Sequence, residues 1–136
     1  MKREGDGASP RGRWPMRMAY YRPDRMLRPR TAVALRAMRP DDGWCDAPGD
    51  RNYNRPVQMP YPASAEEMWR RDGVYDLVAI LGYNDRPRVR GKGSAIFLHL
   101  ARDGLAPTEG CIALRRGDAM RLLALIRPGD VIRIGN

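Results

Sequence analysis

Proline and glycine are frequent enough in this chain to limit what it can fold into. There are 12 prolines and 14 glycines among 136 residues, and both residue types disfavour helix interiors. They suit the turns that join short strands. With 43% hydrophobic residues, a chain of this length has enough apolar content for one core and is too short for two domains. We therefore expect one mainly β domain that spans residues 1–136.

Several segments have the composition of strands. Residues 14–21 alternate large apolar groups, and because Pro15 cannot donate a ladder hydrogen bond we expect an exposed edge strand there. Residues 31–38 are a further candidate. Apolar, β-rich runs predict the remaining strands, at 75–81, 94–100, 111–114 and 131–134.

Two short helices are expected. The sequence S-A-E-E at 64–67 has the form of a capping box, which predicts a helix to about residue 71. Residues 118–126 have one apolar helical face, with Asp118 as the cap and the Pro-Gly pair at 128–129 as the stop. Residues 41–62 show no period and are expected to form a long ordered loop.

Positive charge is concentrated near the start of the chain. The net charge is +9, and residues 1–40 hold 11 Lys or Arg against 3 Asp or Glu, which leaves 14 against 13 in residues 41–136. Such a segment can bind nucleic acid, an acidic surface or an anionic wall polymer. It can also be a solvated, arginine-rich face. Because no nucleic-acid-binding motif accompanies it, we favour the solvated face and expect a monomer without a nucleic-acid partner.

The sequence offers few signals for a membrane, a metal or a disulfide. No run of 18 apolar residues is present, so no membrane span is expected, and residues 1–7 lack the apolar stretch of a secretory signal. The residues alone thus predict a cytoplasmic location. Cys45 and Cys111 could pair only in an oxidising compartment. One histidine and two dispersed cysteines are too few for a structural metal site, so we expect neither a metal nor a cofactor.

The candidates for chemistry are His99, the only histidine, and Cys111. Taken alone, each is more commonly a buried packing residue. Cys111 follows Gly110 in a turn that enters a strand, which lets a substrate approach the backbone. A free thiol is mostly protonated at neutral pH, so a nearby imidazole must take its proton. Neighbouring strand ends could bring the two together, and a backbone carbonyl near His99 or Leu100 is the simplest group to orient the imidazole.

These residues resemble a known signature. His99, followed by T-E-G-C-I-A-L at 108–114, is similar to the His and Ser/Thr-x-Gly-Cys signature of the YkuD-like L,D-transpeptidases, also called the ErfK/YbiS/YcfS/YnhG family. The sequence E-G-D-G-A-S-P-R-G-R-W at 4–14 resembles that family's G-D-G-x-T/S-P-x-G-x-F/W segment. The two motifs occur in the right order, and the likeness extends over nearly the whole chain.

The resemblance implies a β-sandwich-like catalytic domain. Such a domain cuts the bond between the L-centre of a diaminopimelate and the terminal D-alanine of a peptidoglycan stem. Cys111 would be the nucleophile and His99 the general base, while the amides of Gly110 and Cys111 would stabilise the oxyanion. The acyl group would pass to an amine, giving a cross-link or an attached protein, or to water. The resemblance also implies a periplasmic or cell-wall location.

Further residues are expected to contact the substrate. Thr108, Tyr83 and Asn84 would line the pocket. Ala113 stands where many family members have arginine or asparagine, so binding of the substrate carboxylate would fall to Arg115 or to the arginine that follows it.

The chain also departs from the family in other ways. Glu109 stands where many members have histidine, and the interval from His99 to Cys111 is short, which suggests a different loop over the site. The family usually has a strand or two before the G-D-G segment, which begins here at residue 5. The domain is therefore expected to be N-terminally short, with the strand at 14–21 exposed at an edge.

Three functions are compatible with these observations. We favour a cysteine acyltransferase that acts on peptidoglycan stems. An inactive or binding member of the same fold is the first alternative, and alkylation of Cys111 faster than Cys45 at neutral pH would argue against it. A basic nucleic-acid-binding module is the second alternative, and it predicts salt-dependent binding that is lost with residues 1–40.

Overall fold

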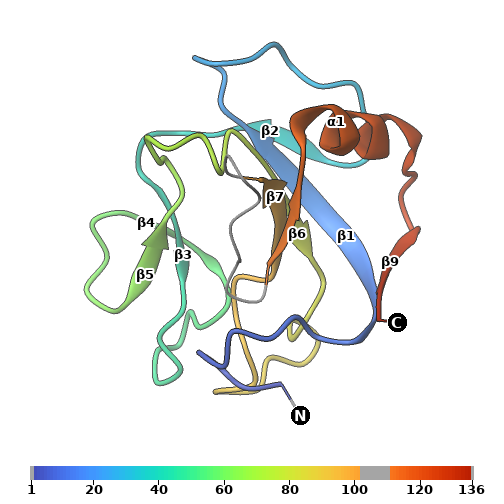
Figure 1. The fold of residues 1–136 in the computed structure, drawn as a ribbon. Helices are drawn as coiled ribbons and strands as arrows, with labels where there is room; N and C mark the ends of the chain where they lie inside the picture. Colours follow the sequence, from blue (N-terminus) through green and yellow to red (C-terminus); the bar gives the residue numbers. More distant parts are fainter. Residues whose placement is uncertain (1, 102–110, 136) are drawn as a thin grey trace.

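The computed structural model describes residues 2–101 and 111–135 (Figure 1). The predicted mainly β, sandwich-like class is confirmed, and the described residues contain one helix. The elements are β1 (Gly12–Tyr21), β2 (Leu35–Ala37), β3 (Asp42–Cys45), β4 (Pro56–Gln58), β5 (Ala65–Glu67), β6 (Leu77–Leu81), β7 (Phe97–Leu100), β8 (Ile112–Leu114), α1 (Arg116–Leu125) and β9 (Val131–Ile134).

Strand β1 is central to the larger sheet. The strand order is β2-β1-β6-β7-β8, and β9 pairs with the first half of β1. After a register shift between Met16 and Met18, the second half of β1 pairs with β6 and β2. The prediction of an edge strand at 14–21 is therefore wrong. Pro15 is accommodated next to this irregularity, where its carbonyl accepts the amide of Gly82 at 2.7 Å.

A smaller sheet with the order β4-β3-β5 forms from residues for which no strand was predicted. Gly43 of β3 pairs with Val57 on one side and Glu67 on the other. The predictions of a long loop at 41–62 and a helix at 64–71 are therefore wrong. The Ser64 hydroxyl, the expected helix cap, donates to Asp46 at 2.7 Å. Strand pairing satisfies the backbone of residues 65–67, so tertiary context overrides the local helix signal.

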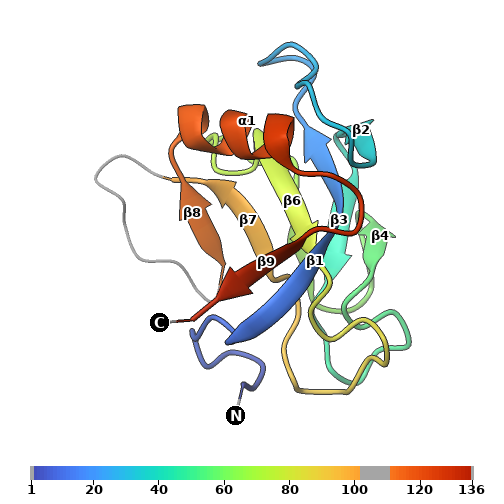
Figure 2. The same ribbon diagram turned by 90° about the vertical axis from the view of Figure 1, so that its right-hand side faces the viewer.

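The larger sheet separates two apolar clusters. On one face, Leu123 of α1 belongs to the same cluster as Leu98. On the other face, Trp44 of β3 belongs to the same cluster as Phe97. Figure 1 shows α1 and the smaller sheet on opposite sides of the larger sheet, and Figure 2, seen from the α1 side, shows the helix above β6, β7 and β8. The face under the smaller sheet is the one that carries the candidate site.

The remaining strand predictions are confirmed. The runs at 75–81, 94–100, 111–114 and 131–134 contain β6, β7, β8 and β9, and residues 31–38 contain β2. The helix starts at Arg116, earlier than expected, and its N-cap Arg115 makes no side-chain capping bond. Asp118 is thus not the cap. It lies in the first turn, where a negative charge is favourable to the helix dipole.

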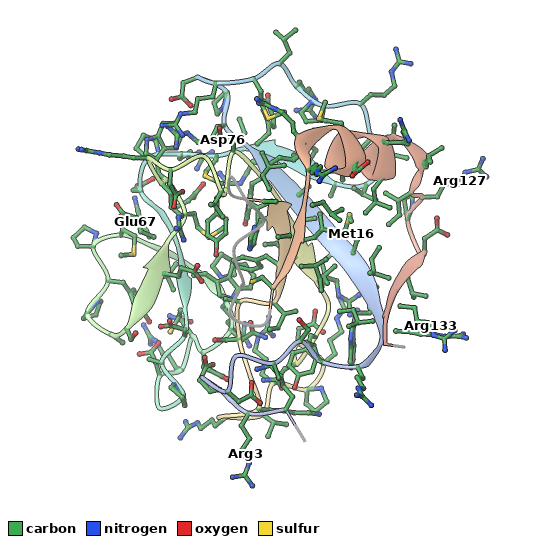
Figure 3. All side chains as sticks on the ribbon, viewed as in Figure 1. Arg3, Met16, Glu67, Asp76, Arg127 and Arg133 are labelled. Atoms are coloured by element: carbon green, nitrogen blue, oxygen red, sulfur yellow. The ribbon has the colours of Figure 1, made fainter. Side chains whose placement is uncertain are left out.

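Side chains on the α1 side divide clearly into core and surface. Figure 3 shows Met16 beneath α1, whereas Arg127 and Arg133 project outward from the end of the helix and from β9. Met16 is buried in the cluster beneath the helix, and both arginines are exposed. This face is therefore packed for stability.

Phe97 links the two sheets, and its truncation is predicted to destabilise the protein. The side chain is fully buried, and its ring centroid is 5.2 Å from that of Trp44 and 5.7 Å from that of Tyr75. Phe97→Ala should lower the free energy of unfolding by about 3–5 kcal/mol, because it leaves a cavity between the sheets. Leu27→Ala, at a side chain that is 91% exposed, should change it by less than about 0.5 kcal/mol. Urea unfolding measures both, and equal losses would contradict the role of Phe97.

Candidate active site

His99 lies near the end of β7 on the face covered by the smaller sheet. It pairs with Val78 of β6 and is buried. Its Nδ1 atom lies 2.9 Å from the carbonyl oxygen of Leu100, which is the kind of backbone partner expected from the sequence. Because a carbonyl oxygen can only accept, Nδ1 carries the hydrogen, and in the neutral ring Nε2 then has the lone pair. Nε2 is therefore the atom that can take up a proton.

Tyr75 forms one wall of the site beside His99. The centroids of the two rings are 5.5 Å apart, and the Tyr75 hydroxyl donates to Glu66 of β5. The Arg70 guanidinium carbon lies 5.0 Å from the Tyr75 ring centroid. Burial, together with the negative charge of Glu66, raises the pKa of Tyr75 well above its ordinary value. The hydroxyl thus stays protonated. No motif singles out these three residues in the sequence.

Cys111 immediately precedes β8, which pairs in parallel with β7. Its side chain is half-buried and packs against the cluster that includes Tyr75, Ala95 and Phe97. The thiol donates to the carbonyl of Ala95 at 3.2 Å. Burial raises the pKa of the Cys111 thiol to about 12, so the resting group is a neutral thiol. The fold therefore brings Cys111 to the sheet face that carries His99.

The residue that accepts the Cys111 thiol has a strained backbone. Ala95 has a φ of 54° and Asn54 a φ of 56°, in the left-handed region that alanine rarely adopts. The Asn54 side-chain oxygen accepts from the Ala95 amide at 3.2 Å and the Trp44 indole at 3.0 Å. Such strain persists where surrounding bonds hold it. Asn54 thus positions the peptide that contacts the thiol.

The side chains of Tyr83 and Asn84 do not meet this pair. Tyr83 belongs to an apolar cluster with Leu81 and Ile96, and its hydroxyl donates to the carbonyl of Lys92 at 2.8 Å. The Asn84 side chain donates to the carbonyl of Val89 at 2.9 Å and accepts its amide at 2.8 Å. Both side chains shape the loop that follows β6. Their carbonyls accept from the Asn54 amide, which is their link to the site.

The other predicted substrate contacts are Arg115 and residues of the turn before Cys111. Arg115 is exposed and is the N-cap residue of α1. Thr108 and Gly110 lie outside the described residues. The described part of the site therefore consists of His99, Cys111 and the groups that surround them.

Cys45 has a different environment from Cys111. Both cysteines are free, and Cys45 is fully buried. Its neighbour Trp44 faces the larger sheet, so Cys45 points to the other side of the strand. There its sulfur lies 3.6 Å from a carboxylate oxygen of Asp50, and burial raises the pKa of the thiol. Cys45 is thus a buried thiol remote from the imidazole.

The family profile for the YkuD L,D-transpeptidase catalytic domain matches residues 1–134. This is essentially the whole chain, so the protein belongs to the YkuD family of L,D-transpeptidase catalytic domains, and the resemblance noted in the sequence is confirmed. Members of the family are cysteine-dependent enzymes that act on peptidoglycan, typically in the periplasm or cell wall. No curated protein and no solved structure matches the chain significantly.

Two further findings concern the described part of the chain. No helix within it is long and apolar enough to cross a membrane. Its residues also form no group of three or more His, Cys, Asp or Glu side chains that could hold a metal ion.

The raised pKa of Cys111 predicts how alkylation depends on pH. The thiolate is the reactive form, and burial keeps the folded thiol protonated until the pH rises towards about 12. Alkylation of Cys111 by iodoacetamide should therefore be slow at about pH 7 and accelerate steadily above about pH 8. It should still exceed alkylation of the fully buried Cys45. Peptide mass spectrometry measures both rates, and a fast plateau between about pH 6 and 8 would instead indicate a preformed thiolate.

Replacement of Asn54 by alanine is predicted to destabilise the protein. The change leaves the Trp44 indole and the Ala95 amide without their buried acceptor, which should lower the free energy of unfolding by at least about 2 kcal/mol. Asn54→Gly removes the same bonds but keeps the left-handed backbone accessible. Urea unfolding of both variants is the measurement. A loss confined to Asn54→Ala would assign the effect to the backbone rather than to the hydrogen bonds.

Proposed function

We propose that this protein is an L,D-transpeptidase in which Cys111 is acylated by a peptidoglycan stem tetrapeptide. D-Alanine is released, and the acyl group passes to an amine. The observation that carries the proposal is the shared position of the reactive pair: in a YkuD chain, His99 and Cys111 lie on one sheet face beside Tyr75, and His99 has its basic atom at Nε2.

The proposed first half-reaction forms a thioester. The Cys111 sulfur attacks the carbonyl carbon at the L-centre of diaminopimelate, its proton passes to His99 Nε2, and the carbonyl electron pair moves onto oxygen. When the tetrahedral species collapses, the C–N bond to D-alanine breaks. The proton on Nε2 then goes to the leaving amine.

The second half-reaction releases the acyl group. The acceptor amine attacks the thioester carbon and gives a proton to His99 Nε2. The C–S bond breaks, and the proton returns to the Cys111 sulfur, so that both residues regain their resting state.

The raised pKa of Cys111 favours proton transfer during the attack rather than before it. A thiol with a pKa of about 12 does not ionise by itself at neutral pH, so His99 would act as the base while the S–C bond forms. The bond from Nδ1 to the Leu100 carbonyl supports this role, because it strengthens when the ring becomes positive. The backbone carbonyl thus takes the orienting position that a carboxylate has in many triads.

Other parts of the proposal come from the family signature. The amides of Gly110 and Cys111 are proposed to stabilise the oxyanion, and Thr108 is proposed to contact the substrate. We also propose that the protein acts in the periplasm or cell wall, where the family typically occurs and where stem peptides are found.

Two substitutions test the roles of the reactive pair. Cys111→Ser should abolish release of D-alanine from a stem tetrapeptide, because a hydroxyl is far less acidic than a thiol. His99→Ala should lower the rate by about 100- to 10,000-fold, the usual effect of removing a positioned base. Cys45→Ala is the matched control and should retain activity. Release of D-alanine is measured by coupled assay on variants that unfold at the wild-type urea concentration.

A carbapenem supplies an independent readout. Intact mass spectrometry should show one added drug mass on the wild-type protein, and peptide mapping should place it on Cys111. The proposed function is wrong if the folded wild-type protein shows neither the adduct nor D-alanine release. An adduct on Cys45 would also count against it.

A further inference from the structure

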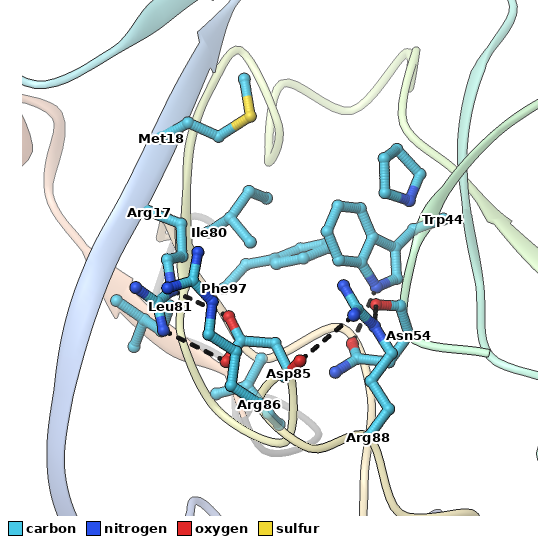
Figure 4. A pocket seen from close by; sticks show the side chains of 12 residues that line it. Arg17, Met18, Trp44, Asn54, Ile80, Leu81, Asp85, Arg86, Arg88 and Phe97 are labelled. Atoms are coloured by element: carbon cyan, nitrogen blue, oxygen red, sulfur yellow. Dashed lines mark hydrogen bonds and ion pairs between the residues drawn. The ribbon is translucent and has the colours of Figure 1, made fainter. Parts of the chain in front are cut away.

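A cavity of about 300 Å³ lies next to the reactive pair on the same side of the larger sheet. Ile80 and Phe97 contribute apolar side chains to its lining, with Met18 on the β1 side and Trp44 on the side of the smaller sheet. Figure 4 shows Phe97 and Ile80 between these two sides. The cavity therefore has an apolar base held by the packing that joins the sheets.

The charged residues of the cavity are predominantly arginines. Arg17, Arg86 and Arg88 line it, with Asp85 as the one carboxylate among the lining residues. In Figure 4, Arg17 and Arg86 lie on the β1 side and Arg88 lies beside Asn54. The lining thus carries a net charge of +2, three arginines less one aspartate.

The three arginines of the cavity differ in their hydrogen bonds. Arg17 donates to both carboxylate oxygens of Asp85, at 2.8 and 3.3 Å. Arg88 donates to the backbone carbonyls of Asn54 and Asp85, both at 3.1 Å. Within the described residues, the exposed Arg86 side chain makes no hydrogen bond or ion pair. Arg17 and Arg88 are thus oriented by the fold, and Arg86 is available to a ligand.

The positively charged arginines in this region repel one another electrostatically. The pKa of Arg88 is lowered, first by burial and then by the neighbouring charges of Arg55 and Arg86. Like charges held close together disfavour the charged form. A bound anion would therefore be favoured electrostatically at this position.

Ala95 links residues of the cavity lining to the thiol of the site. Asn54 and Ile96 both line the cavity. Ala95 precedes Ile96, its amide donates to Asn54, and its carbonyl accepts the thiol of Cys111. A ligand group that contacts Asn54 or Ile96 in the cavity would therefore lie close to Ala95, whose carbonyl contacts the thiol.

The distance to the imidazole is similarly short. Phe97 lines the cavity, and His99 lies two residues further along β7. Two residues of a strand span about 7 Å. An extended peptide spans about 3.5 Å per residue, so a group one or two residues from the scissile carbonyl can reach the cavity.

We propose that this cavity is a subsite for a carboxylate of the stem peptide, with Arg86 and Arg88 as its cationic ligands. The inference rests on the proposed function. The planar guanidinium fork matches a carboxylate, and the apolar base suits the methyl or methylene groups that carry it. A stem tetrapeptide has such carboxylates on its terminal D-alanine, on the diaminopimelate side chain and on the α-carbon of its γ-linked D-glutamate.

The decisive substitution is Arg86→Gln, because this side chain has no bond in the described structure whose loss would disturb folding. The KM for D-alanine release from L-Ala-γ-D-Glu-diaminopimelate-D-Ala should rise about 10- to 100-fold, as expected for loss of a charge-assisted hydrogen bond. Arg90→Gln removes the same charge from an exposed residue of the same loop outside the cavity lining and should leave KM unchanged. Urea unfolding checks that both variants fold.

Substrate variants identify which carboxylate is bound. One peptide ends in D-alaninamide, a second has lysine in place of diaminopimelate, a third has the α-carboxyl of its γ-linked D-glutamate amidated, and a fourth carries all three changes. The wild-type protein should bind one of the first three as weakly as Arg86→Gln binds the unmodified peptide. Arg86→Gln should then cause no further loss with that peptide. An effect of Arg86→Gln that persists on the fully changed peptide would overturn the proposal.

Failure of the subsite is distinguishable from failure of the proposed function. If the wild-type protein releases D-alanine and Arg86→Gln leaves KM unchanged, or if only Arg115→Gln raises it, the subsite is wrong and the function stands. If the wild-type protein releases no D-alanine, calorimetric titration with the tetrapeptide decides. Binding that weakens about tenfold or more in Arg86→Gln but not in Arg90→Gln supports the subsite. Absent binding, or binding equal in both variants, overturns it.

Discussion

The contact between Phe97 and Trp44 holds the smaller sheet against the larger one, and the candidate site depends on it. Their rings meet edge to face with centroids 5.2 Å apart. Phe97 and His99 are on the same face of β7, so the packing that covers Phe97 also encloses the imidazole. Tyr75 contacts both rings. Without this packing, water would reach the imidazole and the thiol, and the electrostatic effects of burial would weaken.

Burial also sets the chemical state of the polar groups in the site. It raises the pKa of Cys111 and of Tyr75, so both keep their protons and act as donors. Such groups need partners, and Ala95 and Glu66 accept their hydrogen bonds. Within the described residues, no buried side-chain nitrogen or oxygen lacks a partner. At rest, Cys111 and Tyr75 are thus neutral hydrogen-bond donors, with the negative charge of Glu66 beside Tyr75.

Some of the arginines in residues 1–40 form ion pairs or ring contacts within the fold. Arg25 pairs with Asp76 at 2.9 Å and Arg36 with Asp42 at 3.0 Å. The Arg22 guanidinium carbon lies 3.6 Å from the Trp69 ring centroid, and an arginine in such a place contributes packing as well as charge. The interpretation of this segment as a solvated face is therefore incomplete. Arg22 and Arg25 contact the segment before β6 and Arg36 contacts β3, whereas Arg17 lines the charged cavity.

The sequence by itself determined the mainly β class and the principal strands and singled out His99 and Cys111 as the candidate site, because apolar runs and the His and Cys signature are local patterns. It did not determine β3, β4 and β5, whose stability comes from pairing with one another, and the capping pattern at 64–67 pointed to a helix. Asn54, Ala95 and the arginines of the cavity had no local signal, since they are far apart in the chain. Only the tertiary structure decided which groups share the face of His99, because burial, hydrogen-bond partners and the crowding of charge depend on distances in space.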